Sequence, residues 1–217
     1  MTRAAGPDGD APSVSIRSVP TDALSPDEID GIRALLVAAF WDEEDERFTE
    51  EDWEHSIGGL HVVLEIDGRI VSHASVVERE LQVAGHPLRT GYVEAVATAP
   101  GFQGRGYGTR VMQLIGRAVD AGYELGALGT GEIGFYERLG WRVWQGPTSV
   151  RTAVGERRTP VEDGGIMVLL TGATPPIDGS LPIAVASSRV RVVVAEPPPP
   201  VGLMVSRLVP RPARRLV

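Results

Sequence analysis

A glycine-rich segment between an extended stretch and an amphipathic helix constrains this chain more than any other feature. The segment Gln103-Gly104-Arg105-Gly106-Tyr107-Gly108-Thr109 follows a predicted strand over residues 88–98 and leads into a predicted helix over residues 109–121. Glycines let the backbone turn so that successive N–H groups converge on one anion, and the helix N-terminus adds partial positive charge. The pattern predicts a diphosphate cradle; an ordinary glycine-rich turn is the alternative.

The residue inventory excludes several kinds of chemistry. All 21 basic residues are Arg, so the chain has no lysine for a Walker loop or a Schiff base. The loop also follows an antiparallel-looking meander rather than the early βαβ unit of a dinucleotide fingerprint. The absence of Cys excludes a thiol nucleophile, disulfides and Cys-ligated metals. No metal site is expected, because none of the four His has a partner four residues away: His55, His61, His73 and His86.

The charge distribution favours a cationic small molecule as the partner. The net charge is −8, and residues 42–54 hold nine acidic residues against one Arg, so this stretch is a poor candidate for a buried element. An acidic body lacks the basic face that nucleic acid requires, so no nucleic acid is expected. The longest apolar run, residues 34–41, falls far short of the roughly 20 residues that span a bilayer. With no visible secretory signal, we expect a cytoplasmic protein without a membrane partner.

The order of predicted elements indicates one mixed α/β (α+β) domain over residues 14–195, with a disordered tail at 1–13 and a Pro/Arg-rich tail at 196–217. Ser25 and Pro26 are typical of a helix start, and Glu28 completes a capping box. Asp67-Gly68 predicts a hairpin turn. The expected strands cover residues 13–19, 60–66, 69–80, 88–98, 125–128, 141–144 and 166–170, with 190–194 as a further candidate; the expected helices cover 26–40, 109–121 and 133–139.

The glycine loop, the element order and the later segment Phe135–Trp141 together resemble the GCN5-related N-acetyltransferases (GNAT). The resemblance implies the GNAT acyl-CoA N-acyltransferase fold, in which helices flank a central mixed, mostly antiparallel sheet. It also implies acetyl-CoA as cosubstrate, without a metal. The loop residues would hold the pyrophosphate, and backbone groups of Val96, Ala97 and Thr98 would hold the pantetheine arm; the loop set is Gln103, Gly104, Arg105, Gly106, Tyr107, Gly108 and Thr109.

Four further blocks resemble the aminoglycoside 2'-N-acetyltransferases: residues 52–59, 91–94, 125–128 and 144–150. This resemblance implies a homodimer that acetylates the 2'-amino group of an aminoglycoside by direct attack of the amine on the thioester.

The reaction needs a base for the ammonium group and an acid for the departing thiolate. Glu94 is the candidate base, acting through water, and Tyr136 is the candidate acid. Their alternatives are a carboxylate on a strand surface and a packed helix aromatic. Asp52 and Glu162, with Glu94, are the candidate carboxylates for the substrate ammonium groups.

Two other functions remain open from the sequence. The chain could acetylate another small amine or a protein N-terminus. It could also be a non-catalytic acetyl-CoA-binding regulatory protein that uses its Pro/Arg-rich tail to bind a partner. The presence of both Glu94 and Tyr136 favours an enzyme.

Overall fold

The first helix begins where its capping residues predict. A computed structural model of the chain describes residues 12–40, 48–152 and 154–186. Strand β1 (Val14–Pro20) leads into helix α1 (Pro26–Ala39). The Ser25 hydroxyl accepts from the Glu28 N–H, and the Glu28 carboxylate accepts from the Ser25 N–H at 2.7 Å. The predicted capping box is therefore confirmed.

Three long antiparallel strands form the centre of the sheet: β2 (Leu60–Ile66), β3 (Arg69–Val83) and β4 (His86–Thr98). The β2–β3 turn lies at Asp67 and Gly68, which both have positive φ, as the sequence predicted. The β3–β4 turn lies at Ala84 and Gly85. The sequence predicted strands over residues 69–80 and 88–98, whereas β3 continues to Val83 and β4 already begins at His86.

After β4 the chain alternates helices and strands: α3 (Tyr107–Gly122), β5 (Leu125–Gly129), α4 (Ile133–Glu137), β6 (Arg142–Val143) and β9 (Ile166–Leu170). Three further strands complete the sheet: β7 (Thr148–Thr152), β8 (Gly155–Arg158) and β10 (Ile183–Ala186). The strand order is β6-β9-β5-β4-β3-β10-β7-β8, with β2 also pairing β3 and β1 pairing β2. Among these described strands, β4 with β5 and β10 with β7 are the parallel pairs. The predicted mixed, mostly antiparallel sheet with flanking helices is confirmed.

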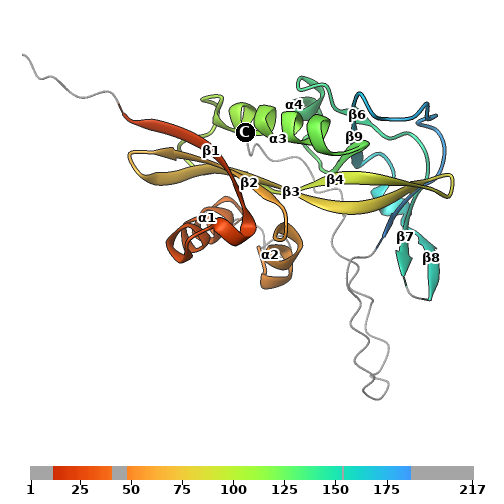
Figure 1. The fold of residues 1–217 in the computed structure, drawn as a ribbon, viewed down its shortest axis with the longest axis horizontal. Helices are drawn as coiled ribbons and strands as arrows, with labels where there is room; N and C mark the ends of the chain where they lie inside the picture. Colours follow the sequence, from red (N-terminus) through yellow and green to blue (C-terminus); the bar gives the residue numbers. More distant parts are fainter. Residues whose placement is uncertain (1–11, 41–47, 153, 187–217) are drawn as a thin grey trace, which may run out of the picture.

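Helices cover both faces of the sheet, as Figure 1 shows. Helix α1 and the short helix α2 (Glu50–Ser56) lie on one face, and α3 and α4 lie on the other. Ile32 and Leu36 of α1 and Val111 and Ile115 of α3 are fully buried against the strands. The central strands are thus apolar on both faces, which fixes their position between the two helical layers.

Several elements escaped the sequence analysis: α2, β7 (Thr148–Thr152), β8 (Gly155–Arg158), a 3₁₀ turn η2 (Pro160–Glu162) and β10 (Ile183–Ala186). The expectation that residues 42–54 hold no buried element is wrong for their last part, because Thr49 caps α2 and Trp53 packs into the core. Residues 1–11 of the predicted first tail, the candidate strand 190–194 and the second tail lie outside the described residues.

Strands β4 and β5 separate partway along their length. Their ladder pairs Thr90 with Leu125, Gly91 with Gly126 and Tyr92 with Ala127. Beyond that point β4 runs on to Thr98 and β5 to Gly129 without further pairs between them. Two neighbouring parallel strands therefore part just before Glu94, in the middle of the molecule.

Candidate functional site

The glycine loop has the geometry of an open anion cradle. Gly104 and Gly106 have φ of +72° and +79°, and a methyl group on either would meet no atom within 4 Å. Gly106 is the N-cap of α3 and has no side chain to satisfy the first N–H groups of that helix. The Arg105 side chain is turned toward Phe102, with its guanidinium carbon 5.4 Å from the ring centroid. The loop is thus not filled by its own side chains.

Glu94 is held by a buried arginine that the sequence analysis did not single out. The Arg79 Nη2 lies 2.8 Å from Glu94 Oε1, and the two side chains are 5% and 25% exposed. The same guanidinium donates to the His55 carbonyl of α2 at 3.3 Å and lies 4.7 Å from the Tyr92 ring centroid. Because breaking such a pair would leave a desolvated charge, Arg79 fixes the Glu94 carboxylate beside the strand separation.

A second carboxylate lies near the same place. Glu162 is 4% exposed, and burial raises the pKa of its carboxyl group. The Tyr92 hydroxyl is buried without a recorded hydrogen-bond partner in the described structure. Burial raises the pKa of Tyr92 well above its usual value, and the charges of Glu94 and Glu162 raise it further. The phenol therefore lies within electrostatic reach of both carboxylates and of Arg79, whose positive charge lowers the pKa of the phenol.

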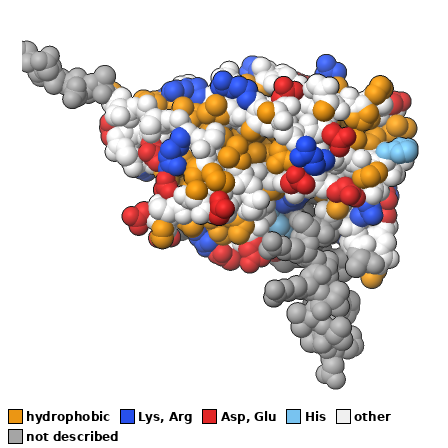
Figure 2. All heavy atoms as spheres, viewed as in Figure 1, with side chains coloured by type: hydrophobic (Ala, Val, Ile, Leu, Met, Phe, Trp, Pro, Cys, Tyr) orange, Lys and Arg blue, Asp and Glu red, His pale blue; other side chains and the backbone are white. Residues whose placement is uncertain are grey.

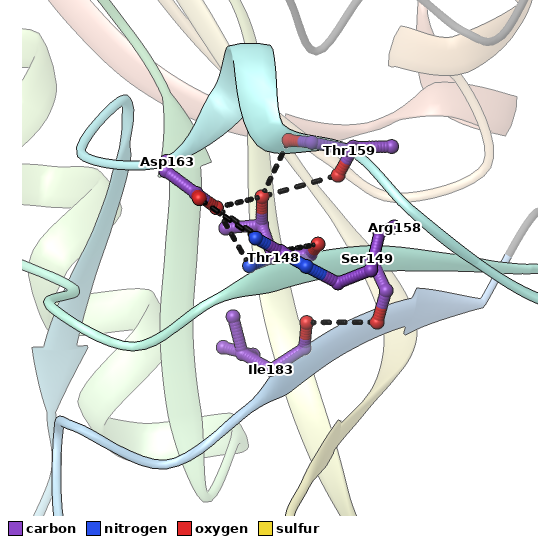
Figure 3. A network of polar contacts seen from close by, with 6 residues as sticks. All are labelled: Thr148, Ser149, Arg158, Thr159, Asp163 and Ile183. Atoms are coloured by element: carbon purple, nitrogen blue, oxygen red, sulfur yellow. Dashed lines mark hydrogen bonds and ion pairs between the residues drawn. The ribbon is translucent and has the colours of Figure 1, made fainter.

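A polar network around Asp163, drawn in Figure 3, holds the η2 turn that carries Glu162. Asp163 accepts hydrogen bonds from the Thr148 N–H at 2.9 Å and the Thr148 hydroxyl at 2.8 Å. It also forms an ion pair with Arg158 at 2.8 Å, and Arg158 and Thr148 hold its pKa well below the ordinary carboxyl range. Asp163 thus anchors η2 to strand β7, and Glu162 precedes it directly.

Tyr136 lies on the other side of the strand separation. It belongs to α4, which follows β5 and covers the α3 face of the sheet (Figure 1). Its ring packs edge-on against Phe135 and Trp141, with centroids 4.9 and 6.3 Å away. Burial raises the pKa of the phenol well above its usual value, so the hydroxyl stays protonated at neutral pH. Such a group can donate a proton or a hydrogen bond without carrying charge.

The β4 residues predicted to hold the pantetheine arm through their backbone groups lie at a β-bulge. Ser75 pairs with Glu94 and His73 with Ala97, so β4 contains one more residue than β3 in this interval. Ala95 has φ of +52°. The Ala97 carbonyl accepts from Ser72 at 3.0 Å, and the Thr98 carbonyl accepts from Gln103 at 3.2 Å. The bulge thus redirects the backbone at the point where β4 leaves β5.

Asp52 has a structural role in addition to any substrate role. Its carboxylate accepts from the Thr49 N–H and hydroxyl, both at 2.8 Å, and so caps α2. The opposite end of that helix contributes the His55 carbonyl to Arg79. Asp52 is therefore linked to Glu94 through α2 and Arg79.

Charges of both signs are interspersed over the face shown in Figure 2, with hydrophobic side chains gathered at its centre. Within residues 12–40, 48–152 and 154–186, no group of three or more His, Asp or Glu could hold a metal ion. No helix in these ranges is both long and apolar enough to cross a membrane.

Comparison with known proteins supports the assignment suggested by the sheet and the loop. Residues 21–144 match the family model described as "Acetyltransferase (GNAT) domain". The aminoglycoside 2'-N-acetyltransferase of Mycolicibacterium fortuitum is 40% identical over 158 residues, which cover 72% of this chain and 79% of that protein. The fold and the loop define an acetyltransferase, and the chain belongs to the GNAT family.

Solved structures share the fold at low sequence identity. The GNAT-family N-acetyltransferase YhbS of Escherichia coli, solved with CoA, has a TM-score of 0.55 and 17% identity, covering 84% of this chain and 93% of that one. A GCN5-related N-acetyltransferase from Kribbella flavida has a TM-score of 0.50 and 19% identity over 62% of this chain. The present chain spans only 34% of that larger protein.

Proposed function

We propose that this chain is an acetyl-CoA-dependent N-acetyltransferase that modifies the 2'-amino group of an aminoglycoside. One observation carries the proposal. The glycine loop, the Glu94 carboxylate that Arg79 fixes, and the protonated phenol of Tyr136 belong to the elements around the point where β4 and β5 separate. The similarity to the Mycolicibacterium enzyme supports the aminoglycoside as acceptor. The CoA complex of YhbS supports the cosubstrate for this fold.

In the proposed arrangement, the N–H groups of residues 103–109 bind the pyrophosphate of acetyl-CoA, with Arg105 over the outer phosphates. The pantetheine arm follows Val96, Ala97 and Thr98 into the strand separation, as an added strand edge would. The thioester then lies between Glu94 and Tyr136. The open Cβ positions of Gly104 and Gly106 are consistent with a closely approaching phosphate.

The chemistry is a direct transfer. Glu94 accepts a proton from the substrate ammonium through a water molecule, and the neutral amine attacks the thioester carbonyl. A new C–N bond forms and the C–S bond breaks as Tyr136 donates a proton to the departing sulfur. The attacking nitrogen then loses its second proton, which returns through water to the Tyr136 phenolate, so that the amide and free CoA thiol are the products. Arg79 forms an ion pair with the Glu94 carboxylate and keeps it in place beside the strand separation.

Three carboxylates would bind the positively charged acceptor. Glu94 and Glu162, both near the Tyr92 hydroxyl, would bind ammonium groups of the acceptor by charge-assisted hydrogen bonds. Asp52 would act from the first turn of α2, where its capping role fixes its orientation. An aminoglycoside, with several ammonium groups on a rigid frame, suits three spaced carboxylates better than a monoamine does.

A thiol-release assay with a panel of amines tests the proposal. Release of CoA with tobramycin and gentamicin, but not with spermine or peptides, is the expected result. Release with peptides alone would instead favour protein N-termini as acceptors. Calorimetric binding of acetyl-CoA without release for any amine would favour a non-catalytic, acetyl-CoA-binding protein.

A further inference from the structure

A chain of buried polar groups runs through the core to the bulge of β4. His73 of β3 contacts the Ala95 carbonyl through Nδ1 at 2.8 Å. Its Nε2 lies 2.9 Å from Nδ1 of His61 on β2, and Nε2 of His61 lies 2.8 Å from the Thr21 hydroxyl. Both imidazoles are completely buried. Buried polar chains are costly unless every member is satisfied, so this one needs an explanation.

The Ala95 carbonyl at one end of this hydrogen-bond chain determines which nitrogen of each imidazole carries the proton. A carbonyl only accepts, so His73 Nδ1 carries a proton. Burial lowers the pKa of His73 to about 3 and that of His61 to about 4, so both rings are neutral at pH 7. His73 Nε2 is then an acceptor, His61 Nδ1 donates to it, and His61 Nε2 accepts from Thr21.

Thr21 can complete this arrangement. The N–H groups of Gly58 and Gly59 donate to its Oγ1 at 2.9 and 3.1 Å. These bonds occupy the lone pairs of the hydroxyl, and its proton faces two acceptors, His61 Nε2 at 2.8 Å and the Gly59 carbonyl at 3.1 Å, of which the imidazole is the nearer. The opposite tautomer of His61 would set two lone pairs against each other at the 2.9 Å contact between the imidazoles. A single directed hydrogen-bond chain therefore leads from Thr21 to the Ala95 carbonyl.

The Ala95 carbonyl belongs to the same peptide unit as the Val96 N–H. In a trans peptide these two groups point in opposite directions, and this chain has no cis bonds among its described residues. The Ala95 carbonyl faces the His73 imidazole, so the Val96 N–H points away from that ring; β4 lies between β3 and the strand β5, which has already separated from it at this level. Ala95 has φ of +52°, a left-handed conformation that a non-glycine residue keeps only where its surroundings hold it there.

We propose that His73, supported by His61 and Thr21, is a positioning residue that aims the Val96 N–H at the thioester carbonyl of the bound acyl donor. This inference rests on the proposed acetyl transfer. The N–H donates to the oxygen on which negative charge develops during amine attack. Hydrogen bonding at the carbonyl end polarises the same amide and strengthens that donation. His73 thus acts on the reaction through one peptide group without touching a substrate.

Two substitutions at one position separate this role from simple packing. His73→Asn keeps an N–H donor at the place of Nδ1, facing Ala95, and loses the contact with His61. His73→Gln keeps an acceptor at the place of Nε2, facing His61, and loses the donor to Ala95. Each variant removes one buried hydrogen bond, so both are expected to be destabilised to a similar extent. A packing role alone predicts similar activities.

The positioning role predicts an unequal result. With tobramycin as acceptor, kcat of His73→Asn stays within about threefold of wild type, while kcat of His73→Gln falls about tenfold or more. Complete removal of an oxyanion-hole donor lowers kcat by roughly 10²–10³-fold, and a misaimed donor should lose part of that factor. The Kd for CoA, which has no acetyl carbonyl, is unchanged in both variants. Equal kcat values in the two variants, or a loss of CoA affinity that parallels kcat, would overturn the proposal.

Nuclear magnetic resonance gives a readout that does not depend on turnover. Long-range ¹H–¹⁵N spectra of wild type at pH 7 should show His61 and His73 as neutral Nδ1–H tautomers. The Val96 amide proton should shift in His73→Gln and change little in His73→Asn. An Nε2–H tautomer of His73 contradicts the proposal even if the enzyme is active. Absence of turnover by wild type with every amine, combined with the expected tautomers, would refute the proposed function and leave the hydrogen-bond chain standing.

Discussion

The anion cradle leads to a prediction with an internal control. In Gly106→Ala, the residue at φ +79° gains a Cβ. A non-glycine residue in this left-handed region costs about 1–2 kcal/mol. For a domain of this size the loss lowers Tm by roughly 2–8 °C. Because no protein atom lies within 4 Å of the new methyl group, no steric cost within the protein is added.

Binding of the cosubstrate should weaken in addition to this loss of fold stability. The new methyl group stands at the mouth of the cradle, where the phosphate oxygens approach the backbone. Overpacking of this kind costs about 1–3 kcal/mol, which corresponds to roughly 5- to 150-fold in Kd for acetyl-CoA. Titration calorimetry measures this change directly.

Gly85→Ala is the matched control. Gly85 has φ of +82° in the β3–β4 turn, and its Cβ would also meet nothing within 4 Å. It should lose the same stability and keep the wild-type Kd. If both variants bind acetyl-CoA like wild type, or if both lose affinity in proportion to their Tm, the phosphate does not lie against Gly106.

Three further substitutions test individual side chains. Glu94→Gln should lower kcat/KM mainly below neutral pH, where the amine is protonated and needs a base; an unchanged pH–rate profile removes Glu94 from that role. Tyr136→Phe should lower kcat about 10²-fold while the Kd for CoA holds, and near-normal single-turnover rates would show that the phenol is not the acid. Asp163→Asn should cost about 1–2 kcal/mol near neutral pH, read as a Tm loss, because Arg158 and Thr148 lose part of their partner. Since the native pKa of Asp163 is lowered, its contribution is present above the ordinary carboxyl pKa and disappears as pH falls. A difference in Tm that persists unchanged in acid would contradict this origin.

Local signals in the sequence were sufficient for most of the central sheet. The Ser25 capping box, the Asp67-Gly68 turn and the glycines before α3 each act over a few residues, so their chemistry can be read without knowing the fold. The order of strands and helices followed from these boundaries. The family resemblance then supplied the topology of a mixed, mostly antiparallel sheet flanked by helices.

The missed elements depend on contacts between distant residues. Helix α2 lies in an acidic stretch that has little apolar character, and it forms because Trp53 packs into the core and Thr49 caps it. Strand β10 pairs with β3 and β7, which are far away in the sequence. No local pattern reveals such partners.

The site was only partly visible in the sequence. The structure brings Glu94 and Glu162 near the Tyr92 phenol, which the sequence could not show because η2 follows β4 by some 60 residues. Arg79 did leave a signal: it stands between Val77 and Leu81, at an alternating position of β3 that otherwise points into the core. A basic residue at such a position indicates a buried ion pair. His61 and His73 gave no signal, since their spacing fits no motif.

A crystal structure of the protein with CoA and tobramycin tests the central claim most directly. We predict pyrophosphate oxygens within hydrogen-bond distance of the N–H groups of residues 104–109. The CoA sulfur should lie beside the Tyr136 hydroxyl, and an amine of tobramycin should lie one water molecule away from Glu94. A pyrophosphate bound elsewhere, or a sulfur remote from both side chains, would contradict the account.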